Sequence, residues 1–190
     1  MKNIEQELKI QLTQRQYQTL VSQSGVSPVK QVNYYFDGDE KPQNLTVRIR
    51  EKNGEYVLCA KIRKGNNNGV SVSDEYEKVV GAEFLRVAQN VGLSRDCLKN
   101  ALGIDADCTL FCQGSLTTYR SKFMLGDLVV EVDKNEYLGV CDYELECENS
   151  DVARLEELKT LLNYRFGIPC KPSKGKAARF ADQKATQNLQ

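Results

Sequence analysis

Hydrophobic and polar residues alternate along much of this chain, and such alternation is typical of β-strands, whose successive side chains point to opposite faces. In the first such stretch, "IEQELKI" at residues 4–10, the apolar residues and Gln6 share one face. The other face carries Glu5, Glu7 and Lys9. We therefore predict a strand at the start of the chain with one mainly apolar face and one charged face.

Further stretches with a strand-like pattern follow at residues 29–37, 44–52, 55–64, 70–80, 109–125, 128–138 and 141–148. Short sequences typical of turns separate them, and the pair Asn53-Gly54 favours a two-residue hairpin. About eight strands joined mainly by hairpins indicate an α+β protein, built on an antiparallel sheet or a closed barrel with helices packed outside it.

Helices are predicted where the apolar period changes from two residues to about 3.6. Thr13 and Gln16 have capping-box spacing at the start of residues 14–23, and Gly25 ends that segment. The other helices are predicted at 82–102 with an interruption near 92–94, within 150–167 with Ser150 or Asp151 as cap and Gly167 as stop, and near 175–184, after which the tail is expected to fray.

Charge and composition exclude several classes of protein. The chain has 190 residues, of which 26 are basic and 26 acidic, so no global field would hold it on nucleic acid or an anionic membrane. No apolar run approaches the roughly 18 residues of a membrane span, and the N-terminus is too polar for a signal peptide. With no linker or repeat in view, we expect a cytoplasmic protein that forms a single domain over residues 1–190.

Two residue types narrow the chemistry further. Seven cysteines without a secretory signal argue against a disulfide framework. The chain has no histidine, which removes Ser-His, Cys-His and His-metal chemistry together. Any catalysis must therefore use carboxylates, lysines and arginines, and any metal that takes part is expected to be a hard one.

Charged residues on the predicted strands are grouped by sign, in pairs two residues apart that share a face. The carboxylate pairs are Glu5/Glu7, Glu75/Glu77, Glu131/Asp133 and Glu144/Glu146, and the cation pairs are Arg48/Arg50, Lys61/Arg63 and Arg120/Lys122. One interpretation is the ordinary solvated face of an antiparallel sheet. The grouping by sign favours a second interpretation, in which the charged face points inward.

An inward charged face needs partners of both signs, since unpaired buried charges are costly. Carboxylates two residues apart lie about 6.6–7 Å apart at Cα and can converge on one hard cation. Arginines and lysines at the same spacing can bind successive phosphates. A polyphosphate with Mg²⁺ meets both needs, so the pattern predicts a phosphate-chain ligand and a divalent metal.

The stretch "EQELK" at residues 5–9 resembles the ExExK motif of the CYTH superfamily, the triphosphate tunnel metalloenzymes, which includes class IV adenylate cyclases and thiamine triphosphatases. Matching motifs follow in order: "NYYFD" (33–37), "VRIRE" (47–51), "CAKIRK" (59–64), "DEYE" (74–77), "YRSKF" (119–123), "VEVDK" (130–134), "DYELECE" (142–148) and "KPSKGKAARF" (171–180). The set spans nearly the whole chain and is most similar to the bacterial branch labelled YjbK-like or adenylate-cyclase-like.

The resemblance implies a closed eight-stranded antiparallel barrel whose tunnel binds triphosphate with Mg²⁺ or Mn²⁺. Carried over by motif, the metal ligands would be Glu5, Glu7, Glu144 and Glu146. The triphosphate contacts would be Lys9, Arg48, Arg50, Lys61, Arg120, Lys122 and one tail lysine, Lys174 or Lys176, with Lys174 preferred. Glu75, Glu77, Glu131 and Asp133 would line the tunnel beside them.

The chain departs from the family pattern in two ways. It has no tryptophan on which the ring of thiamine triphosphate could stack, so Tyr34, Tyr35 or Tyr137 would have to serve. Without a histidine base, attack on phosphorus would rely on metal-activated water, and the catalytic set would be Glu5, Glu7 and Lys9. Lys9 would be a proton acceptor if neighbouring cations lowered its pKa.

Three functions remain open. The first is metal-dependent hydrolysis of the terminal phosphate of inorganic triphosphate or of an organic triphosphate. The second is an adenylate cyclase, which makes cAMP and pyrophosphate from ATP and needs adenine recognition, for which the sequence has no motif. The third is a non-catalytic sensor of polyphosphate or nucleotide. In each case the partner is a small-molecule triphosphate, and we expect a monomer or a homodimer that binds neither nucleic acid nor membrane.

Overall fold

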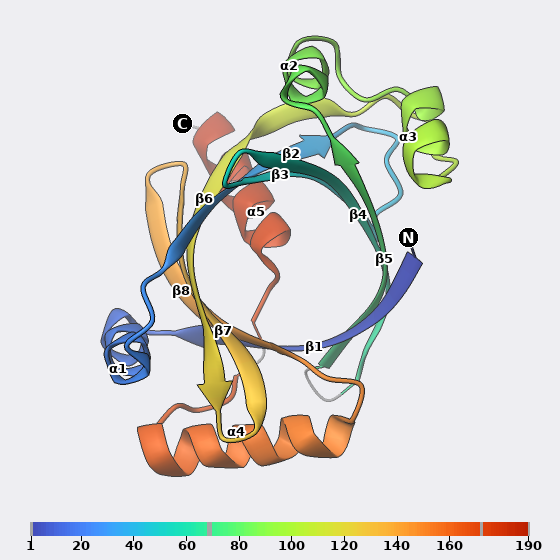
Figure 1. Cartoon of the computed structure of the whole chain (residues 1–190). Coiled ribbons are helices and arrows are strands. Elements are labelled where there is room, and N and C mark those ends of the chain that lie inside the picture. Colours follow the sequence, from blue (N-terminus) through green and yellow to red (C-terminus); the bar gives the residue numbers. More distant parts are fainter. Residues whose placement is uncertain (1, 68–69, 172, 190) are drawn as a thin grey trace. The chain divides into compact units, whose positions relative to one another are not determined.

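The computed structural model describes residues 2–67, 70–171 and 173–189, and its side chains from residue 6 to 66, 70 to 171 and 173 to 189. The elements follow in the order β1 (Lys2–Leu12), α1 (Gln14–Ser24), β2 (Val29–Asp37), β3 (Leu45–Lys52), β4 (Glu55–Asn67), β5 (Val70–Val80), α2 (Ala82–Val91), α3 (Arg95–Leu102), β6 (Phe111–Leu125), β7 (Leu128–Tyr137), β8 (Val140–Glu148), α4 (Val152–Phe166) and α5 (Lys176–Asn188) (Figure 1). Each predicted strand and helix is present, and the interruption predicted near 92–94 separates α2 from α3.

The strands form a closed barrel in the order β1-β5-β4-β3-β2-β6-β7-β8. The pairs β2–β3, β3–β4, β6–β7 and β7–β8 are antiparallel hairpins between neighbours in sequence. β1 pairs antiparallel with β8, which places Lys9 opposite Glu146. The predicted α+β fold on a closed eight-stranded antiparallel barrel is therefore confirmed.

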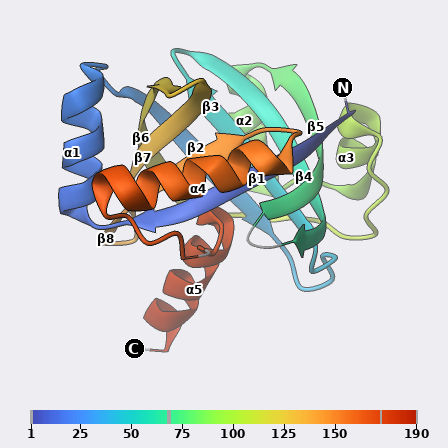
Figure 2. The same ribbon diagram turned by 90° about the horizontal axis from the view of Figure 1, so that it is seen from below.

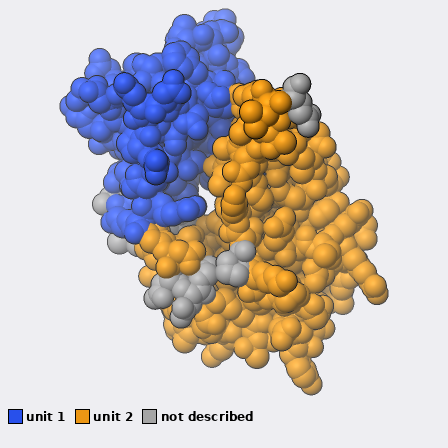
Figure 3. All heavy atoms as spheres, turned by 180° about the vertical axis from the view of Figure 1, so that it is seen from behind, with its two compact units in different colours: residues 1–4, 31–64, 73–116 blue, residues 5–30, 65–72, 117–190 orange. Residues whose placement is uncertain are grey.

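The chain divides into two compact units, which are coloured separately in Figure 3. Unit 1 comprises residues 1–4, 31–64 and 73–116, and unit 2 comprises residues 5–30, 65–72 and 117–190. Each unit has a hydrophobic core cluster of its own. The single domain over residues 1–190 stays a prediction.

In unit 1, α2 and α3 pack on the apolar face of the β3–β4 hairpin. Residues of both helices, among them Leu98, share one core cluster with Ile49 and Leu58 of the strands. The hairpin turns at Asn53 and Gly54, whose φ angles are 53° and 79°. Positive φ at both turn positions is what a two-residue hairpin of this kind requires, so the predicted hairpin is confirmed.

In unit 2, α4 packs on the apolar face of β1, β7 and β8 (Figure 2). Leu155, Leu158 and Leu162 of α4 share a core cluster with Leu8 of β1 and Val130 of β7. The three leucines are spaced by three and four residues, so they line one side of the helix. Because side chains alternate along a strand, the charged residues of these strands lie on the face turned away from α4.

The ends of α1 and α4 follow from their capping residues. The Thr13 backbone N–H donates to Gln16 Oε1 at 2.8 Å and the Gln16 N–H donates to Thr13 Oγ1 at 3.3 Å, which is the predicted capping box. At α4 the Ala153 N–H donates to Asp151 Oδ1 at 2.9 Å, so Asp151 is the cap. Gly167, with φ 61°, ends α4 as predicted.

The C-terminal helix is longer than the sequence analysis expected. α5 continues to Asn188, so fraying after residue 184 was wrong. Two side-chain hydrogen bonds stabilise the last turns: Thr186 Oγ1 donates to the Asp182 carbonyl, and Gln187 Nε2 donates to the Leu138 carbonyl, each at 2.9 Å. The second bond joins α5 to the β7–β8 turn, and local sequence patterns could not predict it.

In the part of the chain that the structure describes, none of the helices combines the length and hydrophobicity needed to span a bilayer.

Candidate functional site

Two rows of charged residues cross the sheet of unit 2 on the face turned away from α4. The first row runs through Lys9, Glu146, Glu131 and Lys122, and the second runs through Glu144, Asp133 and Arg120. Each row takes one residue from each of several neighbouring strands in register. Charged pairs from different strands, which are far apart in the sequence, therefore lie next to one another across the sheet.

The registers place like charges directly opposite each other. Glu131 of β7 faces Glu146 of β8, and Asp133 faces Glu144. Like charges in direct cross-strand pairs are destabilising, and buried carboxylates are costly without cations beside them. The arrangement therefore depends on cations that reach across the rows, and the structure supplies them from β1, β6 and α5.

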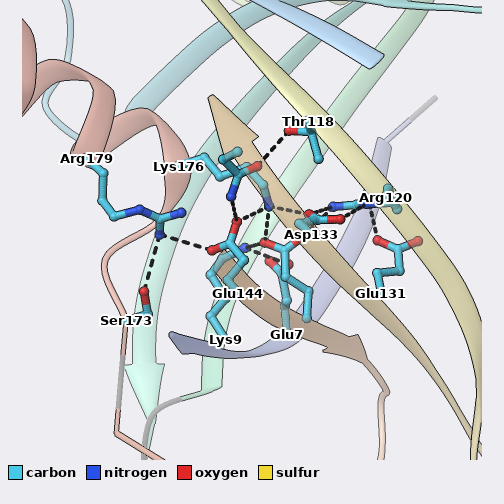
Figure 4. A network of polar contacts seen from close by, with 12 residues as sticks. Glu7, Lys9, Thr118, Arg120, Glu131, Asp133, Glu144, Ser173, Lys176 and Arg179 are labelled. Atoms are coloured by element: carbon cyan, nitrogen blue, oxygen red, sulfur yellow. Dashed lines mark hydrogen bonds and ion pairs between the residues drawn. The ribbon is translucent and has the colours of Figure 1, made fainter. Parts of the chain in front are cut away.

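Arg120 of β6 holds three of these carboxylates (Figure 4). Its Nε lies 2.8 Å from Asp133 Oδ1 and its Nη2 lies 2.6 Å from Asp133 Oδ2, a two-bond pair. Nη2 also lies 2.6 Å from Glu146 Oε2, and Nη1 donates to Glu131. The planar guanidinium thus bridges both rows, which a lysine could not do with the same geometry.

Lys9 of β1 lies between two carboxylates. Its Nζ is 2.5 Å from Glu7 Oε1 and 2.6 Å from Glu146 Oε1. Burial by itself would lower the pKa of the Lys9 ammonium, but Glu146 and Glu7 outweigh burial and raise the pKa above its ordinary value. The condition under which Lys9 would be a proton acceptor, a pKa lowered by neighbouring cations, is not met, because its nearest charged neighbours are carboxylates. The catalytic role of Lys9 stays a prediction.

Lys176, the first residue of α5, reaches three carboxylates at once (Figure 4). Its Nζ lies 2.9 Å from Asp133 Oδ2 and 2.9 Å from Glu146 Oε1, and it pairs with Glu144 as well. The Lys176 side chain is only 7% exposed and the Asp133 side chain 0%. This helix end supplies the cation that the two facing carboxylates of the second row require.

Arg179, one turn further along α5, holds the next carboxylates of β8. Its Nε donates to Asp142 Oδ2 at 2.8 Å and its Nη1 to Glu144 Oε2 at 3.0 Å. Asn135 connects the same two groups, since its Nδ2 donates to Asp142 Oδ1 at 3.0 Å and to Glu144 Oε1 at 3.1 Å. Tyr137 adds a hydrogen bond of 2.6 Å from its hydroxyl to Asp142. α5 is thus anchored by ion pairs along its first turn.

The charged state of the cluster follows from these contacts. Burial would lower the pKa of Arg120, Lys176 and Arg179, but the neighbouring carboxylates raise each pKa above its ordinary value. Burial would raise the pKa of Glu146, but Lys176, Lys9 and Arg120 hold that pKa well below its ordinary value. Glu146 and the three cations are therefore charged in this network.

Three carboxylates of this cluster fit a divalent metal ion. Asp133, Glu144 and Glu146 each offer an oxygen, and these oxygens lie within 4.8 Å of one another. A set of carboxylate oxygens suits hard cations such as Mg²⁺ and Mn²⁺. Two predicted ligands, Glu144 and Glu146, belong to the group, and Asp133 joins them although the sequence analysis placed it beside the ligands.

The two remaining predicted metal ligands are on β1. Glu7 is buried and pairs with Lys9, and it is outside the group of three carboxylates found among the described residues. The Glu5 side chain lies outside the described part of the chain, so its role as a ligand stays a prediction.

The two candidate tail lysines of the predicted phosphate contacts lie in different surroundings. Lys174, which the sequence analysis preferred, has a side chain 69% exposed and an ion pair of 2.6 Å with Asp182 of α5. Lys176 takes the place in the buried cluster instead. Lys122 is also largely exposed, at 63%, and pairs with Glu131 at 2.9 Å.

Unit 1 carries its own set of predicted phosphate contacts. Arg48 Nη2 and Lys61 Nζ lie 3.8 Å and 4.0 Å from Glu75 Oε1, at the long limit for ion pairs. Nε of Arg50 is buried without a hydrogen-bond partner among the described residues. The other predicted lining residue, Glu77, accepts a hydrogen bond of 3.3 Å from the Cys59 thiol.

The three tyrosines considered as stacking platforms differ in their surroundings. Tyr34 packs against the hydrophobic cluster of unit 1 and therefore lies on the apolar face of β2. Tyr35 is opposite Arg48 in the register and is buried. Tyr137 is buried too, and its hydroxyl is engaged by Asp142. Stacking of a substrate ring on any of them stays a prediction.

Sequence reasoning missed Arg179, Asp142 and Asn135, and it ranked Lys176 second. A signal for two of them was present, because Lys176 and Arg179 are three residues apart within a predicted helix and therefore share one side of it. The motif "KPSKGKAARF" contains both. No local pattern pointed to Asn135, whose role arises from cross-strand pairing with Asp142.

A family model and a curated relative both match nearly the whole length of this chain. The pattern described as "CYTH domain" matches residues 3–181 of this chain. The protein named "Putative triphosphatase YjbK" of Bacillus subtilis (strain 168) is 30% identical over 187 residues, which cover 95% of this chain and 96% of that protein.

Solved structures share the fold. A "putative adenylate cyclase" from Bacillus halodurans is 25% identical, with a TM-score of 0.77 and coverage of 94% of this chain and 98% of that chain. A "putative adenylyl cyclase" from Hippeastrum, which reveals a dominant triphosphatase activity, is 24% identical with a TM-score of 0.77, covering 94% and 95% of the two chains. At 24% identity, the similarity to the Hippeastrum protein shows only that the two chains share a fold. From the match over nearly its whole length, this chain belongs to the CYTH family.

Proposed function

We propose that this protein is a metal-dependent triphosphatase, which removes the terminal phosphate of inorganic triphosphate or of an organic triphosphate. The observation that carries the proposal is the buried cluster in unit 2, where Asp133, Glu144 and Glu146 converge beside Arg120 and Lys176. Convergent carboxylates suit a divalent cation and the cations beside them suit phosphate oxygens. The 30% identical relative named as a triphosphatase supports the same reaction.

We assign the carboxylates of the cluster to the metal ion and its cations to the phosphate chain. Asp133, Glu144 and Glu146 would hold Mg²⁺ or Mn²⁺, with Glu7 and the predicted ligand Glu5 beside them. A metal bound there supplies Lewis-acid polarisation of a phosphate oxygen and of the attacking water. The protein itself orients the phosphate chain and neutralises the charge that develops on it during hydrolysis.

Arg120 and Lys9 are the proposed phosphate contacts of unit 2. Both are half-buried cations that pair with carboxylates in the structure. A phosphate chain can replace those carboxylates as their partner when a metal ion binds the carboxylates. Lys9 acts as a protonated contact, not as a base. Lys176 joins this set in place of Lys174.

We further propose that Arg48, Arg50 and Lys61 of unit 1 bind phosphate oxygens. Two facts support this assignment. Arg48 Nη2 and Lys61 Nζ lie 3.8 Å and 4.0 Å from the same oxygen of Glu75, so two predicted phosphate contacts from neighbouring strands are gathered at one place. The Arg50 Nε–H is a buried donor without a partner among the described residues, and a phosphate oxygen would satisfy it.

Adenylate cyclase is the second candidate, since a 25% identical protein of solved structure carries that name. Cyclisation requires the ribose 3′-hydroxyl to attack the α-phosphate, and it releases pyrophosphate. It therefore depends on a defined position for the adenosine end, which hydrolysis of a terminal phosphate does not need.

Product identification separates these functions. The purified protein is incubated with Mg²⁺ or Mn²⁺ and, in turn, inorganic triphosphate, thiamine triphosphate and ATP. We expect orthophosphate from at least one of them, abolished by EDTA and by Glu144→Gln. Glu157→Gln, on the exposed side of α4, is the matched control and should leave turnover unchanged. Release of cAMP and pyrophosphate from ATP would support the cyclase, and tight binding without turnover would support a sensor.

The cytoplasmic location and the monomeric or homodimeric state stay predictions. Ultracentrifugation of the purified protein distinguishes the two oligomeric states.

A further inference from the structure

The amino group of Lys176 takes the position that a metal ion would need. Its Nζ pairs with Asp133, Glu144 and Glu146, the same three carboxylates whose oxygens lie within 4.8 Å of one another. The ammonium and the metal would therefore share one set of ligands. Figure 4 shows the Lys176 side chain directed from α5 into this group.

An ammonium group and a metal ion would compete for these three carboxylates. Mg²⁺ holds its oxygen ligands at about 2.0–2.1 Å, well inside the 2.9 Å that separates Lys176 Nζ from Asp133 and Glu146. A metal at the centre of the three oxygens would lie close to the ammonium and repel it. Metal binding by these carboxylates therefore opposes their ion pairs with Lys176.

Leaving is costly unless the ammonium finds a new partner. Lys176 is only 7% exposed, and an unpaired buried ammonium is strongly disfavoured. Arg179 ties the same turn of α5 to Asp142 and Glu144, so the helix end cannot withdraw to solvent without breaking those pairs too. A metal ion alone offers Lys176 no replacement, whereas a phosphate chain beside the metal offers anionic oxygens within reach of a flexible lysine stem.

We propose that Lys176 is an internal cation that competes with the metal, so that the site takes a metal–polyphosphate complex in preference to the metal alone. Polyphosphate draws Lys176 from the carboxylates as the metal replaces it on them. The ligand part of this inference rests on the proposed function. The competition between Lys176 and the metal does not, because it follows from the shared carboxylates.

The first test measures Mn²⁺ binding without any phosphate, by the EPR signal of free Mn²⁺, on protein stripped of metal. Lys176→Gln should bind Mn²⁺ at least about tenfold more tightly than the wild type, a coupling of ordinary size between two ligands. Lys174→Gln is the matched control: it removes the same charge two residues away, from a lysine that pairs with Asp182 at the surface. It should change Mn²⁺ affinity by less than about twofold.

The second test separates competition from a general electrostatic effect. A preformed complex of Mn²⁺ with a non-hydrolysable imido analogue of triphosphate is titrated calorimetrically into the same variants. Lys176→Gln should bind this complex more weakly than the wild type, because a phosphate contact is lost, although it binds Mn²⁺ alone more tightly. If Lys176→Gln strengthened both, or changed neither, Lys176 would not exchange between carboxylate and phosphate.

Folding of the variants is checked by circular dichroism, and Lys176→Arg serves if Lys176→Gln unfolds. Because arginine keeps the positive charge, Lys176→Arg should bind Mn²⁺ as weakly as the wild type does. Tighter Mn²⁺ binding by Lys176→Arg than by the wild type would overturn the inference. The outcomes separate the two proposals. Tighter Mn²⁺ binding by Lys176→Gln supports the competition even in a protein that hydrolyses nothing, and turnover with unchanged Mn²⁺ affinity in that variant refutes the competition alone.

Discussion

Arg120 and Asp133 form a two-bond ion pair across β6 and β7, with Nε 2.8 Å from Oδ1 and Nη2 2.6 Å from Oδ2. The Asp133 side chain has no exposure to solvent. Arg120 also pairs with Glu131 and Glu146, so one guanidinium neutralises acids from two neighbouring strands. The stability of this carboxylate cluster therefore depends on Arg120.

Replacement of Arg120 should therefore destabilise the protein strongly. We expect Arg120→Met to lower the free energy of unfolding by about 3–5 kcal/mol, because it leaves buried carboxylates without their cation. Lys122→Met is the matched control on the same face of β6, and its exposed pair with Glu131 should be worth about 0–1 kcal/mol. Urea unfolding of metal-free protein measures both. Equal losses in the two variants would contradict the importance assigned to burial.

The N-terminal acids should be required for metal-dependent turnover. We expect Glu5→Gln combined with Glu7→Gln to reduce turnover with Mg²⁺ or Mn²⁺ by at least about a hundredfold, as loss of charge stabilisation in an active site commonly does. The circular dichroism spectrum should match that of the wild type. Full activity in the double variant would remove both residues from the site.

The Cys59 thiol should resist alkylation at mildly alkaline pH. Burial, reinforced by Glu77 and partly offset by Arg48, raises the pKa of Cys59 to about 12. Iodoacetamide at pH 8.5 should therefore modify the exposed Cys141 and leave Cys59 intact, as measured by peptide mass spectrometry. Modification of both at the same rate would mean that Cys59 is accessible.

The same shift predicts the sign of a stability change. Because the folded pKa of Cys59 is raised, its contribution to stability is fully present below the unfolded pKa of about 8.5 and is lost as pH rises from there towards 12. Cys59→Ala should therefore lose less stability than the wild type between pH 8.5 and 10, in urea unfolding at each pH. A parallel decline in the two proteins would contradict the shift.

Two glycines with open space around them should respond to alanine in opposite ways. A Cβ atom at Gly54 or at Gly65 would meet no atom within 4 Å, but Gly54 has φ +79° in the β3–β4 turn. Gly54→Ala should lower the free energy of unfolding by about 1–2 kcal/mol, because alanine is strained in the left-handed backbone conformation. Gly65→Ala should raise the free energy of unfolding by about 0.4–1 kcal/mol. Thermal unfolding of both variants checks this, and a loss at Gly65 equal to that at Gly54 would contradict it.

The strands and their faces were predictable because their signals are local. Alternation in "IEQELKI" depends only on the two-residue period of a strand, and the capping box of Thr13 and Gln16 spans three residues. The Asn53-Gly54 turn is similarly encoded by two adjacent residues. These features required no knowledge of the tertiary structure.

The composition of the carboxylate group was less predictable, because it depends on register between strands. Pairs such as Glu144 and Glu146 follow from spacing along one strand, but Asp133 joins them only because β7 pairs with β8 so that Asp133 faces Glu144. Directly opposite residues lie closer together than residues two apart on one strand. Spacing along β8 therefore brings Glu144 and Glu146 together, and strand pairing decides that Asp133 joins them.

The choice between Lys174 and Lys176 depended on how a distant helix docks. Both are lysines at the start of the tail helix, two residues apart, and the ion pair of Lys174 with Asp182 is local to that segment. Lys176 is distinguished by contacts with β7 and β8, which are remote in sequence. The anchoring of Arg179 on Asp142 fixes the same docking.

The most direct test of the account is ³¹P NMR of inorganic triphosphate incubated with the purified protein and Mg²⁺, repeated with Mn²⁺. We expect the triphosphate signals to be replaced by equal amounts of orthophosphate and pyrophosphate, and EDTA to stop the conversion. Triphosphate that persists unchanged with both metals, while ATP is converted to cAMP and pyrophosphate, would contradict it.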